Sequence, residues 1–311
     1  SIQAHPDKAL AEKLHAERPN VYKDENHKPE MAVAISEFEA LSGFVTTEEL
    51  VAALESVPEL MAAVGEAAST TVVEAHKAGK DPKAPLKEAF TKLMTCDKEL
   101  VAMSLTGLVA RLKAKKATGE LTSKETLLLR LDEQYPKDVG ILSACFLNYI
   151  VLAPGEAVYM AANEPHAYLF GECAEVMATS DNVVRAGLTP KLRDTDILCS
   201  MLTYNQGVPE VLKGECVDAC TRHYRPPFDE FALDIITVPA AGKHLMPAVP
   251  GAALLLVSGG EGTAVVKSPW ADVAEDSSAH SGPVSHGHVF YLPAGASVHF
   301  EAGGGGDPSL M

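Results

Sequence analysis

The hydrophobic pattern of this chain changes period twice. Between about residues 46 and 135, apolar residues recur every three or four positions, which is typical of amphipathic helices. Thr46 followed three residues later by Glu49 is a capping-box signature and predicts where the first helix begins. Further helical periods follow over 86–94, 99–115 and 126–135. The pattern predicts an all-helical block over 46–135, and Pro136 ends its last helix.

The flanking regions have the pattern of β-structure. Residues 1–45 carry no long helical pattern, and residues 1–6 read as a strand and its exit. Beyond residue 136, short apolar runs are bounded by Gly, Pro and Asn, which favours a β-sandwich or barrel. These runs cover residues 146–153, 157–161, 252–257, 263–266, 289–292 and 297–300. The segment 180–205 is more polar and is expected to be irregular.

Two of these β-segments share one internal spacing. The stretch from Gly155 to His166 and the stretch that starts at Gly287 both resemble the second cupin motif, in which a strand runs into a tight turn. Pro and Gly or Asn supply the dihedral angles of such a turn. The first copy places His166 where cupins have a metal-ligating histidine. In the second copy His299 comes one residue late and is expected to point away. We therefore expect two related barrels, one with a metal and one without.

Composition and charge limit the classes of function and partner that this chain can have. The chain has 311 residues, 47% of them hydrophobic, enough for two or three cores. No apolar run approaches the ~20 residues of a spanning helix, and no secretory leader is visible. Lys and Arg total 26 against 42 for Asp and Glu, and the net charge of −16 argues against nucleic-acid and anionic-membrane partners. Six scattered cysteines favour a reducing compartment, so a soluble cytoplasmic protein is expected.

Short polar motifs near the start could bind a metal. Gln3 and His5 are two positions apart, on one face of a strand, and an imidazole is a good zinc ligand. The proline before Glu30 holds Lys28 extended, so that Lys28 and Glu30 share a face while His27 points the other way. Each motif alone has an ordinary explanation, a chance pair or a surface ion pair.

Four motifs together resemble one family. SIQAHPDK, NHKPEM, PHAY and SDNVVRAGLTPK are similar to motifs of the type I mannose-6-phosphate isomerases (phosphomannose isomerases), and the resemblance covers almost the whole chain. It implies a mainly β fold with an α insertion, built from cupin or jelly-roll barrels and an all-helical domain. The implied domains are a discontinuous metal-binding cupin domain, a helical insertion domain and a C-terminal cupin-like domain, over residues 1–45 with 136–200, 46–135 and 201–311.

The resemblance also implies a site. One zinc ion per chain would be held by Gln3, His5, Glu30 and His166. The family's catalytic arginine falls on Arg185, and residues that line its active site fall on Lys28, Tyr168, Glu175 and Asp181. The group that moves the proton stays open among Lys28, Glu175, Asp181 and His27. Substrate binding is expected from Ser1, Lys28, Tyr168 and Arg185.

The implied activity is a zinc-dependent aldose-ketose isomerisation of mannose 6-phosphate and fructose 6-phosphate through an enediol(ate), feeding GDP-mannose synthesis. Zinc and an arginine suit this chemistry, because both stabilise charge that develops on the substrate oxygens. A small sugar phosphate is the expected partner, and a monomer the expected state. The family carries a further segment before the Gln-x-His motif. A non-catalytic metallo-cupin that binds a sugar phosphate or a partner is therefore the alternative.

Other metal-ligating residues carry weaker signals. Cys216, Cys220 and His223 could suggest a second metal site, but the C-x3-C spacing departs from the usual C-x2-C and no fourth ligand is evident. His286 and His288 alternate in a polar loop and are expected to be exposed. The sequence favours no metal at either place.

Overall fold

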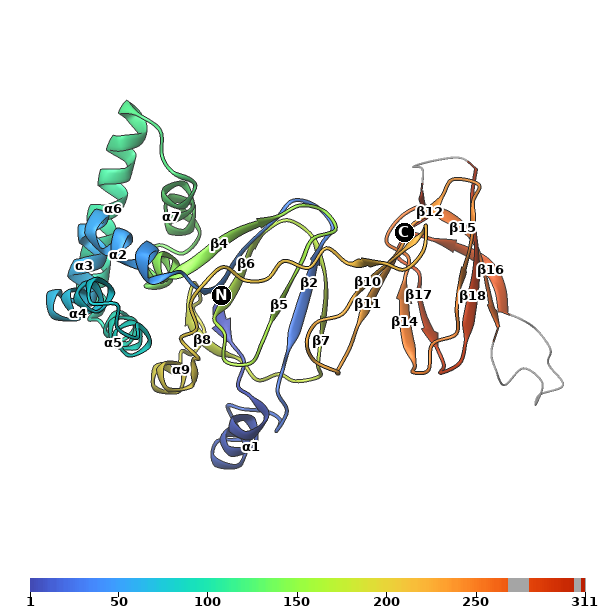
Figure 1. Ribbon diagram of the computed structural model, residues 1–311, viewed down its shortest axis with the longest axis horizontal. Coiled ribbons are helices and arrows are strands. Elements are labelled where there is room, and N and C mark those ends of the chain that lie inside the picture. The colour runs from blue at the N-terminus through green and yellow to red at the C-terminus, as the bar shows by residue number, and fades with distance from the viewer. Residues whose placement is uncertain (268–279, 305–308, 311) are drawn as a thin grey trace. The chain divides into compact units, whose positions relative to one another are not determined.

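The computed structural model describes residues 1–267, 280–304 and 309–310 (Figure 1). The chain forms two compact units. The first contains Ser1–Lys213 and Pro226–Phe231, and the second contains Gly214–Arg225 and Ala232–Met311. Each unit has a hydrophobic core of its own.

The first unit is built around two antiparallel sheets. One sheet has the strand order β4-β3-β6-β1-β8, and the other has the order β5-β2-β7. Their strands are β1 (Ile2–Ala4), β2 (Glu30–Ala34), β3 (Phe38–Phe44), β4 (Leu147–Leu152), β5 (Ala157–Met160), β6 (His166–Phe170), β7 (Cys173–Met177) and β8 (Val184–Gly187). The short first strand β1 lies between β6 and β8, so the start of the chain is held by segments far along the sequence.

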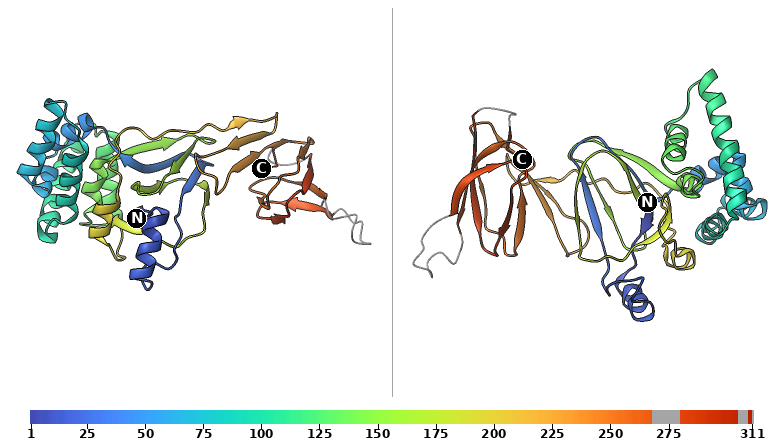
Figure 2. Two further views of the ribbon diagram at one scale, coloured as in Figure 1. Left: turned by 60° about the horizontal axis from the view of Figure 1, so that its bottom comes forward. Right: turned by 180° about the vertical axis from the view of Figure 1, so that it is seen from behind.

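Helices fill the stretch between β3 and β4. They are α2 (Thr47–Ser56), α3 (Pro58–Val64), α4 (Glu66–Lys77), α5 (Lys83–Met94), α6 (Lys98–Thr118) and α7 (Ser123–Gln134), and they form one group at the end of the sheets (Figure 2). The capping box predicted at Thr46 is present, and Thr122 forms a second one. The short helix α8 (Gly140–Ser143) and the 3-10 turn η1 (Ala144–Phe146) lead back into β4.

Two helices contradict the sequence-based expectations. Residues 1–45 were expected to lack a long helix, yet α1 (Lys8–Glu17) follows β1 directly. Asp7 begins it by accepting a hydrogen bond from the Leu10 amide, and Ala11 and Leu14 are buried beneath it. The expectation was wrong because two buried apolar residues among many charged ones do not produce a recognisable helical pattern. Likewise α9 (Thr195–Met201) lies in the segment expected to be irregular.

One continuous core joins the helices to the larger sheet. Phe44 at the end of β3 meets Phe90 of α5 edge-on, with ring centroids 5.2 Å apart. Phe44 also stacks on Tyr204, and Phe90 meets Phe146 of the η1 turn. The helical block is therefore packed against the sheet through aromatic rings and is not tethered only by its two connections.

A polar contact reinforces this junction and supports a prediction. Arg130 of α7 contacts both carboxylate oxygens of Glu39 in β3, to which the Tyr149 hydroxyl also donates at 2.7 Å. These donors outweigh the effect of burial and lower the pKa of Glu39. Arg130→Ala removes this hydrogen-bonded ion pair, and we expect it to lower the free energy of unfolding by about 1–2 kcal/mol. The loss is no larger because solvent weakens a partly exposed charged pair.

The expected loss depends on pH. Because the pKa of Glu39 is depressed, its contribution is complete above its unfolded value and is lost as the pH falls through its folded value. Urea unfolding at neutral and acidic pH measures this, with exposed Lys113→Ala on α6 as control. A deficit that did not shrink toward acidic pH would contradict the ion-pair explanation.

The second unit consists of β-structure in its described part. Its strands are β9 (Glu215–Cys216), β10 (Thr221–Tyr224), β11 (Leu233–Ile236), β12 (Val238–Pro239), β13 (Lys243–Met246), β14 (Ala253–Leu256), β15 (Glu261–Lys267), β16 (His280–Ser285), β17 (Val289–Leu292), β18 (Ser297–Ala302) and β19 (Ser309–Leu310). The largest sheet has the order β13-β18-β15-β16, and β14 pairs with β17. The β-rich fold with a helical insertion confirms the predicted fold class.

The internal repeat is visible in the backbone. Gly155 and Gly287 have φ angles of 85° and 87° before β5 and β17, and Asn163 and Gly295 have φ angles of 64° and 79° after them. Both pairs are eight residues apart. The position of the second copy that corresponds to His166 holds Val298, which is fully buried. His299 points outward beside Glu301, as expected from its offset.

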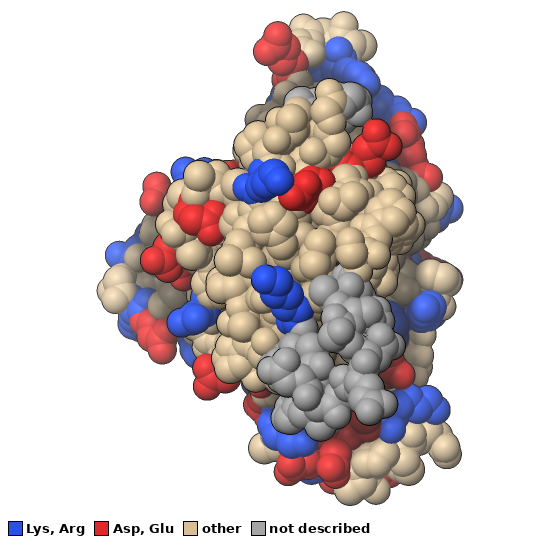
Figure 3. Space-filling view, turned by 90° about the vertical axis from the view of Figure 1, so that its right-hand side faces the viewer, with Lys and Arg blue, Asp and Glu red and all other residues tan. Residues whose placement is uncertain are grey.

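One face of the molecule shows how its charges are distributed. Basic and acidic side chains are interspersed among uncharged residues on the face in Figure 3. His286 and His288 are exposed, as predicted. Among the described residues, no helix has both the length and the apolar character needed to cross a bilayer.

Candidate metal centre

Three residues that are distant in sequence meet inside the first unit. His5 follows β1, Glu30 begins β2 and His166 begins β6, and one ligand atom from each lies within 4.8 Å of the others. The Nε2 atoms of His5 and His166 each lie 3.2 Å from an oxygen of Glu30. All three residues are at most 2% exposed. The structure therefore brings two imidazoles and a carboxylate together in a site shielded from water.

Gln3 is placed beside this cluster by strand pairing. In the antiparallel ladders Gln3 is opposite His166 on β6 and opposite Arg185 on β8. Directly opposed residues point to the same face of a sheet. Gln3, His166 and Arg185 therefore share the face that does not pack into the core, while Ile2 and Ala4 are buried on the other. Ser1 donates a hydrogen bond of 2.9 Å to Gln3 Oε1.

The orientation of both imidazoles suits a cation. His5 Nδ1 lies 2.7 Å from the carbonyl oxygen of Asn182, and His166 Nδ1 lies 3.0 Å from that of Glu164. A carbonyl only accepts, so each Nδ1 carries a proton, and Nε2 is the ring atom that can offer a lone pair to a cation. His5 Nε2, His166 Nε2 and Glu30 Oε2 are buried without a hydrogen-bond partner among the described residues. A cation bound between these atoms would satisfy all three.

The charge on Glu30 supports the same conclusion. Burial alone would raise the pKa of Glu30, but the contacts with His166 and His5 outweigh it and hold that pKa well below its usual range. The Lys28 ammonium lies 3.3 Å from Glu30 Oε1. The carboxylate is therefore ionised, and nitrogen and oxygen donors of this kind are those that zinc binds.

The turn between β5 and β6 fixes His166 relative to His5. Asn163, in the left-handed conformation, donates its backbone N–H to the His5 carbonyl at 2.7 Å. Its side chain accepts from the Asp7 amide and donates to the Asp7 carboxylate. The Asp7 and Asn163 side chains thus join the segment that follows His5 to the turn that precedes His166.

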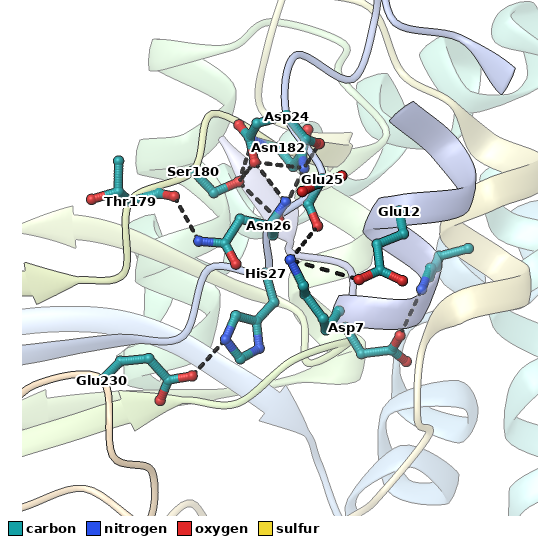
Figure 4. A network of polar contacts seen from close by, with 12 residues as sticks. Asp7, Glu12, Asp24, Glu25, Asn26, His27, Thr179, Ser180, Asn182 and Glu230 are labelled. Carbon is teal, nitrogen blue, oxygen red and sulfur yellow. Dashed lines mark hydrogen bonds and ion pairs between the residues drawn. The ribbon is translucent and has the colours of Figure 1, made fainter. Parts of the chain in front are cut away.

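A second network supports His5, and it was not among the predictions made from the sequence. Asn182, whose carbonyl accepts from His5, is 1% exposed. Its side-chain amide donates to the Asp24 and Asn26 carbonyls at 2.7 and 3.0 Å (Figure 4). Asp24 in turn accepts from the Ser180 hydroxyl and the Asp181 amide, both at 2.8 Å. The loop before Glu30 thus holds the carbonyl that orients His5. The turn-forming residues Asp24 and Asn26 are the local signal that could have indicated this loop.

This network yields a testable expectation. Asp24→Ala removes the acceptor that fixes the loop 180–182, and we expect zinc affinity to fall by about 10–100-fold, the usual effect of losing an outer-shell partner. Asp24→Asn keeps one acceptor oxygen and should fall less. Competition with a chromophoric chelator measures both, and Glu25→Ala is the control, since Glu25 contacts Lys8 only through its backbone oxygen. Equal affinity of Asp24→Ala and the parent chain would exclude the role.

The remaining predicted residues differ in whether they face this cluster. Tyr168 follows His166 by two positions on β6, and its buried hydroxyl has a pKa well above the usual value because of burial and the charges of Glu30 and Glu175. Glu175 is opposite Ala32 on β2, and so faces the same side as Glu30. His27 instead contacts Glu230 at 2.5 Å (Figure 4) and is not part of the cluster.

Arg185 and Asp181 line a hollow of about 280 Å³. Lys191, which was not among the predicted site residues, lines it as well. Its place in the SDNVVRAGLTPK motif could have indicated it, since it is a cation six residues after Arg185. The carboxylates of Asp181 and Asp194 also line the hollow, and Asp194 is paired with Arg18. The two cations are suited to an anionic group.

Two family models and several known proteins match this chain. The family of phosphomannose isomerase type I catalytic domains matches residues 1–47, and that of the type I helical insertion domains matches residues 63–147. Mannose-6-phosphate isomerase 1 of Arabidopsis thaliana is 46% identical over 97% of this chain. The human mannose-6-phosphate isomerase is 38% identical over 96% of it. The aligned regions span 68% and 70% of those relatives' own lengths.

Solved structures agree. A mutant phosphomannose isomerase from Salmonella typhimurium superimposes with a TM-score of 0.75 at 26% identity, covering 97% of this chain and 76% of that one. A zinc-bound mannose 6-phosphate isomerase gives a TM-score of 0.74 at 26% identity, with 97% and 76% covered. The sequence similarity and the fold lead to one conclusion: this chain belongs to the type I phosphomannose isomerase (mannose-6-phosphate isomerase) family of enzymes.

Proposed function

We propose that this chain holds one zinc ion through Gln3, His5, Glu30 and His166 and interconverts mannose 6-phosphate and fructose 6-phosphate. The observation that carries the proposal is the convergence of three buried, unpaired ligand atoms from β1, β2 and β6. Gln3 completes the set, because it shares a face with His166. The zinc-bound relative supports the choice of metal.

The reaction moves a proton between C1 and C2 of the sugar through an enediol(ate). Zinc supplies a Lewis acid that stabilises negative charge on the substrate oxygens. Arg185 lies opposite Gln3 and offers a fixed fork of N–H donors to the same oxygens. The buried walls around His5 and His166 exclude water, which strengthens these interactions.

The sugar phosphate needs a cationic site in a chain that is acidic overall. Arg185 and Lys191 line the same hollow, and we assign the phosphate to it. Tyr168 is protonated, as its raised pKa requires, and donates to a substrate hydroxyl. Lys28, 14% exposed, contacts Glu30, and Ser1 donates to Gln3, and we propose that both also bind the substrate.

Three of the proposed acid–base groups remain compatible with the geometry. Lys28 contacts Glu30, the exposed Glu175 is close enough for its charge to raise the pKa of Tyr168, and Asp181 lines the hollow. His27 is the least suited, because its imidazole is engaged by Glu230. We propose that the proton moves through Lys28, Glu175 or Asp181.

The product chemistry suggests a metabolic role. Mannose 6-phosphate made in this way would feed GDP-mannose synthesis. The cysteines among the described residues are all free, in keeping with a reducing cytoplasm. We propose that the chain acts there as a monomer on a small sugar phosphate.

A coupled assay on the purified chain tests the function. We expect conversion of mannose 6-phosphate that a chelator abolishes and that added zinc restores. The same chain should bind fructose 6-phosphate in the zinc-loaded form. Stoichiometric zinc without turnover would overturn the isomerase proposal and favour a metal-dependent sugar-phosphate binding protein.

A further inference from the structure

A second group of metal-ligating side chains lies in the C-terminal unit, far along the chain from the first centre. Asp218 and Cys220 belong to the turn between β9 and β10, and His244 belongs to β13. One ligand atom from each lies within 4.8 Å of the others. The sequence drew attention to Cys216, Cys220 and His223, but the fold selects a different set: His223 contacts Asp234 at 2.5 Å.

The turn holds the carboxylate in place. Asp218 Oδ1 accepts hydrogen bonds from the backbone amides of Cys220 and Thr221, at 2.7 and 2.9 Å. These bonds lower the pKa of Asp218, so the group is a carboxylate. An ionised oxygen ligand is therefore fixed next to the Cys220 thiol without any metal being needed to order it.

The imidazole has the environment of a metal ligand. The His244 side chain is 9% exposed, and its Nε2 lies 3.2 Å from the Thr221 hydroxyl. When Nε2–H donates to that hydroxyl, Nδ1 presents its lone pair to Asp218 Oδ1 at 4.0 Å. This separation is too long for a hydrogen bond, and it is about 0.7 Å longer than the ~3.3 Å between two ligands of a tetrahedral zinc, so a small movement of either side chain would complete the geometry. An outer-shell partner on the second ring nitrogen is typical of metal-bound histidines.

The sulfur indicates which cation fits. A thiolate with an imidazole and a carboxylate selects zinc over magnesium or calcium, which prefer oxygen ligands alone. Cys220 is free and partly exposed, and Cys216, also free, has its Sγ 3.2 Å from the Asp218 carbonyl on the same turn. A second thiol therefore lies on the turn that carries Asp218 and Cys220.

We propose that Asp218, Cys220 and His244 form a second zinc site, with Cys216 or water as the fourth ligand. The metal would join the β9–β10 turn to β13 and thereby stabilise the C-terminal unit, in which both segments lie. It has no part in the isomerisation, whose metal ligands are all in the other unit.

Cobalt distinguishes the two centres, because only the second contains sulfur. Loading the purified chain with Co²⁺ should produce a thiolate-to-metal charge-transfer band in the near ultraviolet, which the Gln, His and Glu ligands of the first centre cannot give. The band should persist in His166→Ala, where the first centre is broken, and there we expect it to saturate at one Co²⁺ per chain.

Single substitutions identify the residues that produce the charge-transfer band. We expect Cys220→Ser to remove it and His244→Ala to weaken Co²⁺ binding by roughly ten-fold or more. Cys96→Ser, another partly buried free thiol, should leave it unchanged. Circular dichroism checks that each variant is folded. If the parent chain gave no band, or if the band survived Cys220→Ser, the proposal would be overturned, whatever the state of the isomerase activity.

Discussion

A chain carrying His166→Ala should bind zinc too weakly to retain it and should have no isomerase activity. His166 Nε2 is one of the three buried atoms that face each other without a hydrogen-bond partner among the described residues, and alanine removes one of the two imidazole ligands. Loss of a direct ligand should cost more than the ~10–100-fold in affinity that an outer-shell partner contributes. Metal content after dialysis and the coupled assay measure the two effects.

The design must separate this centre from the second one. We would make the substitution in a Cys220→Ser background, so that zinc bound by the C-terminal turn does not mask the loss. His76→Ala, an exposed histidine of α4, is the matched control and should keep both metal and activity. Unchanged zinc content in the His166 variant would refute the ligand assignment.

Arg185→Ala should lose turnover while keeping its zinc. The guanidinium lies opposite Gln3 and lines the hollow with Lys191. Removing one preorganised donor to a developing oxyanion typically lowers kcat by about 10²–10³-fold. Arg185→Lys retains the charge but not the fork of donors, so we expect only a partial recovery.

Kinetic constants show whether Arg185 acts on the transition state. An unchanged kcat with a raised KM would mean that the arginine only holds the bound substrate, contrary to our assignment. Lys191→Ala is the matched variant, because we assign Lys191 to the phosphate alone. It should raise KM more than it lowers kcat. Metal analysis of both variants should show normal zinc.

The sequence predicted the helical block well because its signals are local. The capping box of Thr46 and Glu49 depends on residues three positions apart, and the structure contains it. The tight turn before His166 was also predictable, since Asn163 adopts the left-handed conformation that the motif requires. By contrast, α1 has only two buried positions to mark it, and its pattern is hidden among charged residues.

The support of the metal centre could not be predicted in this way. Asp24 and Asn182 are 158 positions apart, and their hydrogen bond depends on how two loops pack. Lys191 becomes part of the hollow only because the segment after β8 folds back beside Arg185. Such contacts follow from tertiary packing, which no local period records. The separation of His223 from Cys220 has the same cause, since His223 pairs across the strands with Asp234.

The insertion of the helical block between β3 and β4 has a consequence for folding kinetics. Gln3 reaches its sheet only through β6 and β8, whose residues 166 and 185 follow the whole block. Contacts of such long sequence separation form slowly, because closing a long loop costs entropy before any contact compensates for it. On the ribosome, His5 and Glu30 emerge first and wait while the helices are made and begin to pack. The zinc centre is therefore expected to be among the last structures to form, and metal uptake should report the final step of folding of the first unit.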